Sequence, residues 1–354
     1  MRILERRRNR IILAASVLAA MGLTTAFFLF ACRPAWRRAE PSRPPLIGFS
    51  LDSLVVERWR RDVDIFTQAA KELGAEVLLK VANQDHYAQE LQIRELADAG
   101  IHVLVVVPND ANRLSAAIQE VRGRGIRVLS YDRLVRKAGV DLYVSFDNEM
   151  VGRLMAQAVS RAVPRGGYII INGARTDYNS HMINAGIRGV LDPLVESGAI
   201  RIVGEIWPEN WDNQEVKAAL DKIIQVDRDI DAVVAGNDML AEAAISVLAE
   251  NRLMRNVRIA GQDAELAACQ RIAEGSQYAT VYKPIERLAL RAAGYAVMLA
   301  RGEDIQTVAV IHDGQYEVPY VRLEPILVTR DRLDATVIRD GFHRAEDVYR
   351  NVRR

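Results

Sequence analysis

The chain has 354 residues, of which 50% are hydrophobic and 26% are charged, a globular composition with room for two domains. The formal net charge of +1 argues against a general nucleic-acid-binding protein. The cysteines, Cys32 and Cys269, and the scattered histidines match neither a disulfide framework nor a metal-ligand spacing, so we expect no metal site and no cofactor.

The first 45 residues are predicted to target and anchor the protein. Five arginines between Arg2 and Arg10 precede an apolar run at residues 11–32, and fewer arginines follow it. As a helix, these 22 residues would extend roughly 33 Å at about 1.5 Å per residue, enough to cross a bilayer. The arginine distribution predicts a cytoplasmic N-terminus and a folded part outside the cytoplasmic membrane.

Two interpretations of this segment remain open. One is an uncleaved membrane anchor, because the apolar region of a secretory signal is usually only about 7–15 residues long. The other is a lipoprotein signal with a lipid on Cys32, because residues 29–32 resemble a lipobox, although Phe30 stands where a small residue is usual. Residues 33–45 contain four prolines and predict a stiff tether to the folded part.

From Leu46 onward, short β-branched runs alternate with amphipathic stretches. The first series predicts strands at residues 46–50, 76–81, 102–107 and 127–130, and helices at 58–73, 87–99 and 112–122. The second series predicts strands at 168–171, 201–206, 232–235, 257–260 and 279–282, and helices near 180–196, 212–226, 238–250 and 264–274. A helix at 284–300 and extended segments at 307–311 and 321–328 follow.

Largely apolar strands that alternate with helices predict two doubly wound α/β lobes with parallel sheets. We expect residues 46–149 and 284–306 to form the first lobe, and residues 150–283 and 307–354 to form the second. The chain would then cross between the lobes three times. Such connections make a hinge, and hinge closure around a ligand is common in two-lobe proteins.

Polar and aromatic residues cluster at the predicted carboxyl ends of the strands, where open α/β sheets bind ligands. A sugar needs aromatic rings for its C–H faces and charged or amide partners for its hydroxyls. Trp59 and Trp211 would supply the rings. The polar candidates are Arg58, Asp132, Arg133, Asp177, Asn179, Asn237, Asp263 and Lys283.

Structural roles compete with binding for these residues. Trp59 is also a candidate core aromatic, Asp132 with Arg133 a candidate surface ion pair, and Asn237 or Asp263 a candidate helix N-cap. Arg175, Trp207 and Asp238 are interpreted as structural.

The carboxylates among these candidate residues are not expected to be catalytic. Cations at Arg58, Arg133 and Lys283 should hold the carboxylates of Asp132, Asp177 and Asp263 ionised with lowered pKa values, whereas a general acid needs a raised pKa.

Several unusual strings occur in order along the chain, namely 57–59 (ERW), 130–133 (SYDR), 145–149 (SFDNE), 261–263 (GQD), 280–284 (TVYKP) and 335–343 (ATVIRDGFH). In these strings the chain from about Leu46 to its end resembles the D-xylose-binding proteins of bacterial ABC transporters, in the type I periplasmic sugar-binding family. Tyr178 departs from that family, in which asparagine is commoner at this place.

The resemblance implies that an aldopentose, D-xylose, binds without covalent chemistry between the lobes, with Arg58, Trp59, Asp132 and Arg133 as first-lobe contacts. It implies second-lobe contacts from Asp177, Asn179, Trp211, Asn237 and Asp263, and a contact from Lys283 near the hinge. The implied partner is an ABC permease.

A sensing role remains open, in which the closed protein signals to a membrane histidine kinase. A hydrolase or isomerase acting on the sugar is a third hypothesis. The effector domain of a transcription repressor is set aside, because an apolar span stands before Leu46 where such repressors carry a DNA-binding helix-turn-helix.

Overall fold

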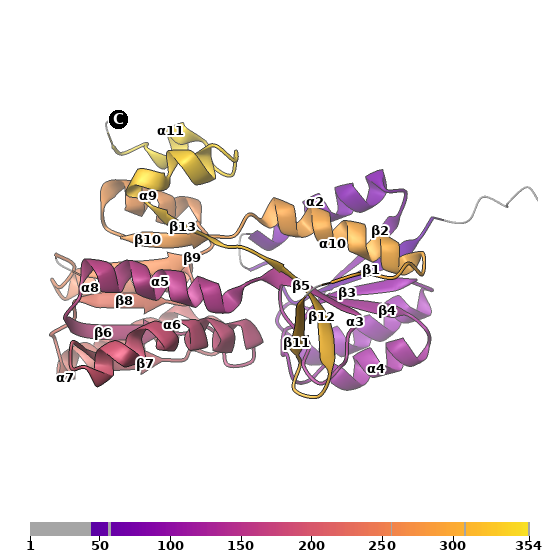
Figure 1. The fold of residues 1–354 in the computed structure, drawn as a ribbon, viewed down its shortest axis with the longest axis horizontal. Helices are drawn as coiled ribbons and strands as arrows, with labels where there is room; N and C mark the ends of the chain where they lie inside the picture. The colour runs from indigo at the N-terminus through magenta and orange to yellow at the C-terminus, as the bar shows by residue number, and fades with distance from the viewer. Residues whose placement is uncertain (1–43, 56–57, 256, 308, 353–354) are drawn as a thin grey trace, which may run out of the picture. The chain divides into compact units, whose positions relative to one another are not determined.

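The computed structural model describes residues 44–55, 58–255, 257–307 and 309–352. The predicted membrane anchor, Cys32, most of the tether and Glu57 lie outside these residues. Residues 44–354 form one compact unit, which contains two sheets with helices on their faces (Figure 1). No helix among the described residues combines the length and the hydropathy that a membrane crossing requires.

The first lobe is built on a sheet in the order β11-β12-β5-β4-β3-β1-β2. Its strands are β1 (Leu46–Leu51), β2 (Glu76–Val81), β3 (Val103–Val107), β4 (Arg127–Tyr131), β5 (Leu142–Phe146), β11 (Ala309–His312) and β12 (Glu317–Leu323). Every pair is parallel except the β11–β12 hairpin. Strand β3 is buried along its whole length, as a central parallel strand covered on both faces should be.

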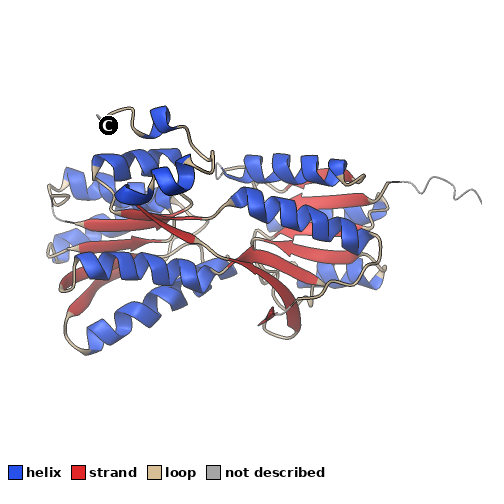
Figure 2. Ribbon diagram, turned by 45° about the horizontal axis from the view of Figure 1, so that its top comes forward, coloured by secondary structure: helices blue, strands red, loops and turns tan. Residues whose placement is uncertain are grey.

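Helices cover both faces of this sheet (Figure 2). Helices α2 (Arg58–Glu72) and α10 (Ile285–Ala300) lie side by side on one face and enclose an apolar core around Phe49 and Phe66. Helices α3 (His86–Asp98) and α4 (Ser115–Gly123) enclose a second core on the other face.

The second lobe is built on a sheet in the order β13-β10-β9-β8-β6-β7, with only β13 antiparallel to its neighbour among the described strands. Its strands are β6 (Gly166–Ile171), β7 (Ile200–Ile206), β8 (Ala232–Ala235), β9 (Arg258–Gln262), β10 (Ala279–Tyr282) and β13 (Ile326–Thr329). Its helices are α5 (Asn148–Ala162), α6 (Tyr178–Glu196), α7 (Asn213–Val226), α8 (Asp238–Glu250), α9 (Leu266–Glu274) and α11 (Ala345–Val348), with short helical turns at Arg330–Arg332 and Asp334–Ile338. Helices α5 and α6 share a core on one face, and α7 and α8 on the other.

In the described part of the chain, three connections join the lobes. They run from β5 to α5, from β10 to α10, and from β12 to β13. The third differs from the sequence-based boundary, which assigned residues 307–354 to the second lobe. Strand β12 hydrogen-bonds to β5 of the first sheet, so the chain crosses after Leu323, where Glu324 and Pro325 interrupt the extended run.

Candidate functional site

All ten residues predicted for the site line one cavity between the lobes. Trp59 and Trp211, which come from different lobes, share the cavity. The two rings therefore lie around one space, as the sequence predicted, and their contact with a sugar stays a prediction.

The first lobe contributes residues that follow the carboxyl ends of its strands. Arg58 and Trp59 open helix α2, and Asp132 and Arg133 follow strand β4 directly. Asp132 has a positive φ of 60°, a left-handed conformation that is uncommon for a residue with a side chain. The Asp132 amide donates to Val144 O at 2.8 Å, and this bond helps to hold the turn that brings both side chains to the cavity.

The second lobe contributes residues from the starts of helices and the ends of strands. Asp177 caps helix α6, and its carboxylate accepts from the amide of Asn179 at 2.9 Å. Asn237 caps helix α8 and accepts from the Leu240 amide at 2.8 Å. Asn237 therefore has the structural role that the sequence left open, and it also lines the cavity.

Arg58 is held by two carboxylates in a buried cluster. Its guanidinium makes a two-pronged contact with Asp62, at 3.1 Å and 3.2 Å, and its Nη2 lies 2.9 Å from Asp132 Oδ2. The Tyr131 hydroxyl donates to Asp62 from behind. Asp62 is fully buried and so fixes the guanidinium without reaching the cavity itself.

Arg133 joins the two lobes. Its Nε lies 2.7 Å from Asp177 Oδ2 of the second lobe, and its Nη1 donates to Asp52 Oδ2 of the first lobe at 2.8 Å. A neighbouring contact runs from Asn179 Nδ2 to the Asp132 carbonyl at 3.1 Å. The lobes are thus closed on each other by polar contacts at the cavity wall.

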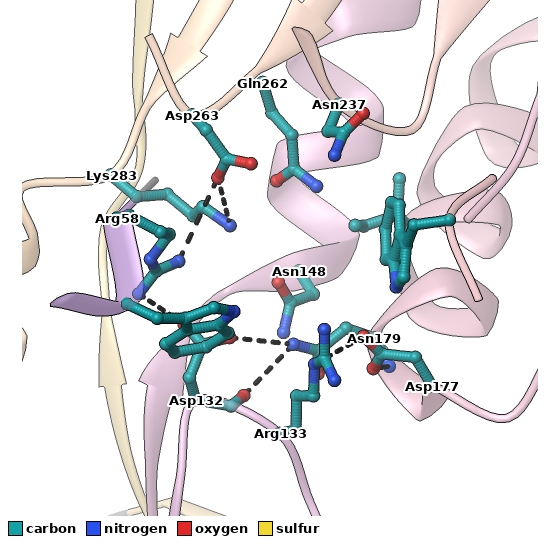
Figure 3. Close-up of a pocket in the computed structure, with 13 residues that line it drawn as sticks. Arg58, Asp132, Arg133, Asn148, Asp177, Asn179, Asn237, Gln262, Asp263 and Lys283 are labelled. Carbon is teal, nitrogen blue, oxygen red and sulfur yellow. Dashed lines mark hydrogen bonds and ion pairs between the residues drawn. The ribbon is translucent and has the colours of Figure 1, made fainter. Parts of the chain in front are cut away.

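Lys283, in the connection between β10 and α10, lies with its Nζ 2.8 Å from Asp263 Oδ1. Figure 3 shows dashed lines from the Asp263 carboxylate to the cationic ends of both Lys283 and Arg58, and Arg58 Nη1 lies 3.9 Å from Asp263 Oδ1. Acidic and basic groups therefore alternate around the cavity, which balances the buried charges in pairs.

The pKa values of two carboxylates in the cavity, Asp132 and Asp177, are shifted in opposite directions. Burial alone would raise the pKa of Asp132, but the nearby charges of Arg58, Lys283 and Arg133 together lower it below the ordinary value. Burial raises the pKa of Asp177 despite the opposing charge of Arg133. The expectation of a lowered pKa is therefore wrong for Asp177, since Asp177 lies near fewer cations than Asp132 does.

Buried polar atoms that line the cavity lack hydrogen-bond partners within the described chain. They are the indole Nε1 of Trp59, the indole Nε1 of Trp211 and the amide oxygen of Gln262. A buried donor or acceptor left unpaired costs about 1–3 kcal/mol. A ligand that carries both donors and acceptors would remove this cost.

A model of the periplasmic binding protein domain matches residues 47–304. The D-xylose-binding periplasmic protein of Haemophilus influenzae is 43% identical over 304 residues, which cover 86% of this chain and 92% of that protein. The chain belongs to the periplasmic binding protein family. The D-xylose-binding periplasmic protein of Escherichia coli is 41% identical over 303 residues, covering 85% of this chain and 92% of that one.

A solved periplasmic binding protein structure has the same fold. The carbohydrate transporter solute-binding protein from Chloroflexus aurantiacus, in complex with D-glucose, aligns with a TM-score of 0.80 at 27% identity. The alignment covers 85% of this chain and 97% of that protein.

Residues that sequence reasoning did not select also line the cavity of this periplasmic binding protein, namely Asn148, Ile183 and Gln262. Gln262 directly precedes Asp263 at the end of β9, so its position next to a predicted site residue could have identified it. Asn148 starts helix α5 at the first interlobe connection, an element that the sequence analysis did not predict. Ile183 lies on α6, where an apolar residue carries no recognisable binding pattern.

Proposed function

We propose that the protein binds D-xylose between its lobes as the solute-binding component of an ABC sugar transporter. The observation that carries this proposal is the cavity itself. In it, buried indole N–H groups and an amide oxygen lack hydrogen-bond partners within the described chain and lie beside alternating acidic and basic groups. The identity to two D-xylose-binding periplasmic proteins selects the sugar.

The cavity chemistry fits a polyhydroxylated, uncharged ligand. A hydroxyl donates to a carboxylate and accepts from a guanidinium or ammonium, so hydroxyls on one ring can use the alternating charges of Asp132, Arg133, Asp263 and Lys283. A charged ligand would leave one sign of charge unmatched. Binding is therefore reversible and non-covalent, and the sugar leaves unchanged.

Sugar favours the closed form because its contacts come from both lobes at once. Arg58 and Asp132 lie on the first lobe, and Asp177 and Asn237 lie on the second. A ligand shifts such an equilibrium by its differential affinity for the closed state. The closed form is then the form that a membrane partner recognises.

The test is isothermal calorimetry and thermal denaturation of the full chain in mild detergent with D-xylose, L-arabinose, D-ribose and D-glucose. We expect D-xylose to bind most tightly and to stabilise the fold by about 2.7 kcal/mol at a hundredfold excess over Kd. Absence of binding by D-xylose, or tighter binding of D-glucose, would reject the assignment. Recovery of unchanged sugar after long incubation separates binding from catalysis.

A second candidate role is sensing, in which the closed form docks on a membrane histidine kinase. The 22-residue apolar run at residues 11–32 favours it, because an uncleaved anchor would keep the receptor beside its partner. A lipid on Cys32 would fit a transport component equally well. Deleting the gene and measuring both labelled xylose uptake and xylose-dependent transcription separates the roles, and mass spectrometry of the mature N-terminus separates anchor from lipoprotein.

A further inference from the structure

The closed lobes also touch outside the sugar cavity, at two arginine–aromatic pairs. In the first pair, Arg61 of helix α2 reaches the C-terminal segment of the second lobe. Its Nη1 donates to the Phe342 carbonyl at 3.1 Å, and its guanidinium carbon lies 4.8 Å from the centre of the Phe342 ring. Neither residue lines the sugar cavity.

Phe342 is fixed on the second lobe by its own packing. Its ring lies 5.0 Å from the ring of Tyr282 and 4.5 Å from that of His343, between ring centres. His343 in turn hydrogen-bonds to the Ala264 carbonyl at 2.7 Å. Arg61 and Phe342 line a second cavity, and Arg58 and Asp263 line both this cavity and the sugar cavity. The pair therefore stands directly beside two predicted sugar contacts.

The second pair lies on helix α6 and on the loop after β4. The guanidinium carbon of Arg136 lies 4.7 Å from the centre of the Tyr178 ring, and Tyr178 packs against the apolar core of the first lobe although it opens a second-lobe helix. Two backbone bonds support the pair. The Ala111 amide donates across the lobes to Thr176 O at 2.9 Å, and the Arg136 amide donates to Ala111 O at 2.7 Å.

We propose that these two pairs, Arg61–Phe342 and Arg136–Tyr178, act as clasps that set the closing equilibrium and thereby the sugar affinity without touching the sugar. This inference rests on the proposed function only for its affinity readout. The apparent Kd equals the intrinsic Kd divided by the fraction of closed, binding-competent protein. Contacts that exist only when the lobes are closed raise that fraction, and each arginine–aromatic contact is strong enough to change it measurably.

The first test uses Arg61→Gln, which removes the cation and keeps much of the stem. We expect Kd for D-xylose to rise about 2- to 30-fold, mainly through faster dissociation, because the lost contact exists only in the closed form. The matched control is Arg60→Gln, since Arg60 is the exposed neighbour on the same helix. Phe342→Leu, which retains apolar packing on Tyr282 but has no aromatic face, should reproduce the effect from the other side.

A second readout does not depend on sugar. The Ala111 amide bridges the lobes far from Arg61 along the chain, so its hydrogen-exchange protection in the sugar-free protein reports closure. Arg61→Gln should accelerate that exchange, which a merely local effect on α2 would not do. Arg136→Gln should raise Kd in the same way, with Lys137→Gln as its control, and the double variant should show the product of both factors.

The proposal is wrong if folded Arg61→Gln and Phe342→Leu both bind D-xylose with the wild-type Kd and both exchange the Ala111 amide at the wild-type rate. If the wild-type protein binds no xylose, the proposed function fails, and the exchange experiment still decides the clasp.

Discussion

The Trp211 ring occupies the space that a side chain at Gly173 would need. A Cβ at position 173 would stand 2.2 Å from Trp211 Cη2 and 2.4 Å from Ser180 Oγ. Asn210 and Trp211 both have positive φ angles, 47° and 60°, so the loop that carries the ring is held in an unfavourable backbone conformation. The glycine and the strained loop together place the indole at the cavity.

Gly173→Ala is therefore expected to displace the Trp211 ring and to weaken D-xylose binding by about tenfold or more, equivalent to about 1.4 kcal/mol. Calorimetry measures the effect. The control is Gly189→Ala on the exposed side of helix α6, where an added Cβ meets nothing within 4 Å. That control should bind normally and gain roughly 0.5–1 kcal/mol of stability. Normal binding by Gly173→Ala would show that the ring position is unimportant.

Asp177→Asn tests the ion pair that joins the lobes. Asparagine keeps the N-cap of α6, so the variant removes the charge facing Arg133 and leaves the helix start intact. A hydrogen bond to a charged group contributes about 1.5–3 kcal/mol, which predicts a ten- to hundredfold weaker Kd. Asp85→Asn changes the same kind of cap on α3 away from the cavity and should leave Kd unchanged. Equal Kd values for the two variants would remove Asp177 from the site.

Substitutions at Asn237 separate capping from binding. Asn237→Ala removes the acceptor for the Leu240 amide and should lower the free energy of unfolding by about 1 kcal/mol, whereas Asn237→Ser keeps a capping oxygen. Both variants should weaken sugar binding, because neither side chain reaches as far as the amide. Calorimetry and urea unfolding of both proteins give the two quantities. Wild-type affinity in Asn237→Ser would assign the residue to capping alone.

The buried carboxyl group of Asp238 should make the free energy of unfolding depend on pH. Burial raises the pKa of this carboxyl to about 7, although Thr280 and Gln277 donate to it. An unfolded aspartate has a pKa of about 3.9, so between about pH 4 and 7 the native state binds more protons than the unfolded state. The free energy of unfolding should therefore fall, from this group, as the pH rises through that window.

The Asp238→Asn variant should not show this fall in the free energy of unfolding between about pH 4 and 7. Denaturant unfolding of both proteins between pH 4 and 8 makes the comparison, and identical pH profiles would contradict it. Asp132, whose pKa is lowered, contributes in the opposite direction, because its stabilisation is lost as the pH falls below about 4.

Local sequence patterns predicted most helices and strands because each amphipathic stretch and apolar run carries its own period. The predicted helix at residues 238–250 matches α8, for example. Strand β5 and helix α5 were not predicted, although they form the first connection between the lobes. The predicted strand at residues 321–328 proved to be parts of two strands in different sheets, since strand partners are chosen by tertiary packing and not by local period.

By itself the sequence determined the two-lobe α/β architecture, because its alternating apolar runs and amphipathic stretches carry their own periods. It also indicated the ten residues that line the cavity, through their places at the carboxyl ends of predicted strands and through the resemblance to sugar-binding proteins. Only the tertiary structure decided which charges pair, such as Arg133 with Asp177, and which lobe holds the β11–β12 hairpin. It also revealed Arg61 against Phe342. These contacts join residues from separate lobes, and their geometry depends on how two folded bodies close, which no local pattern encodes.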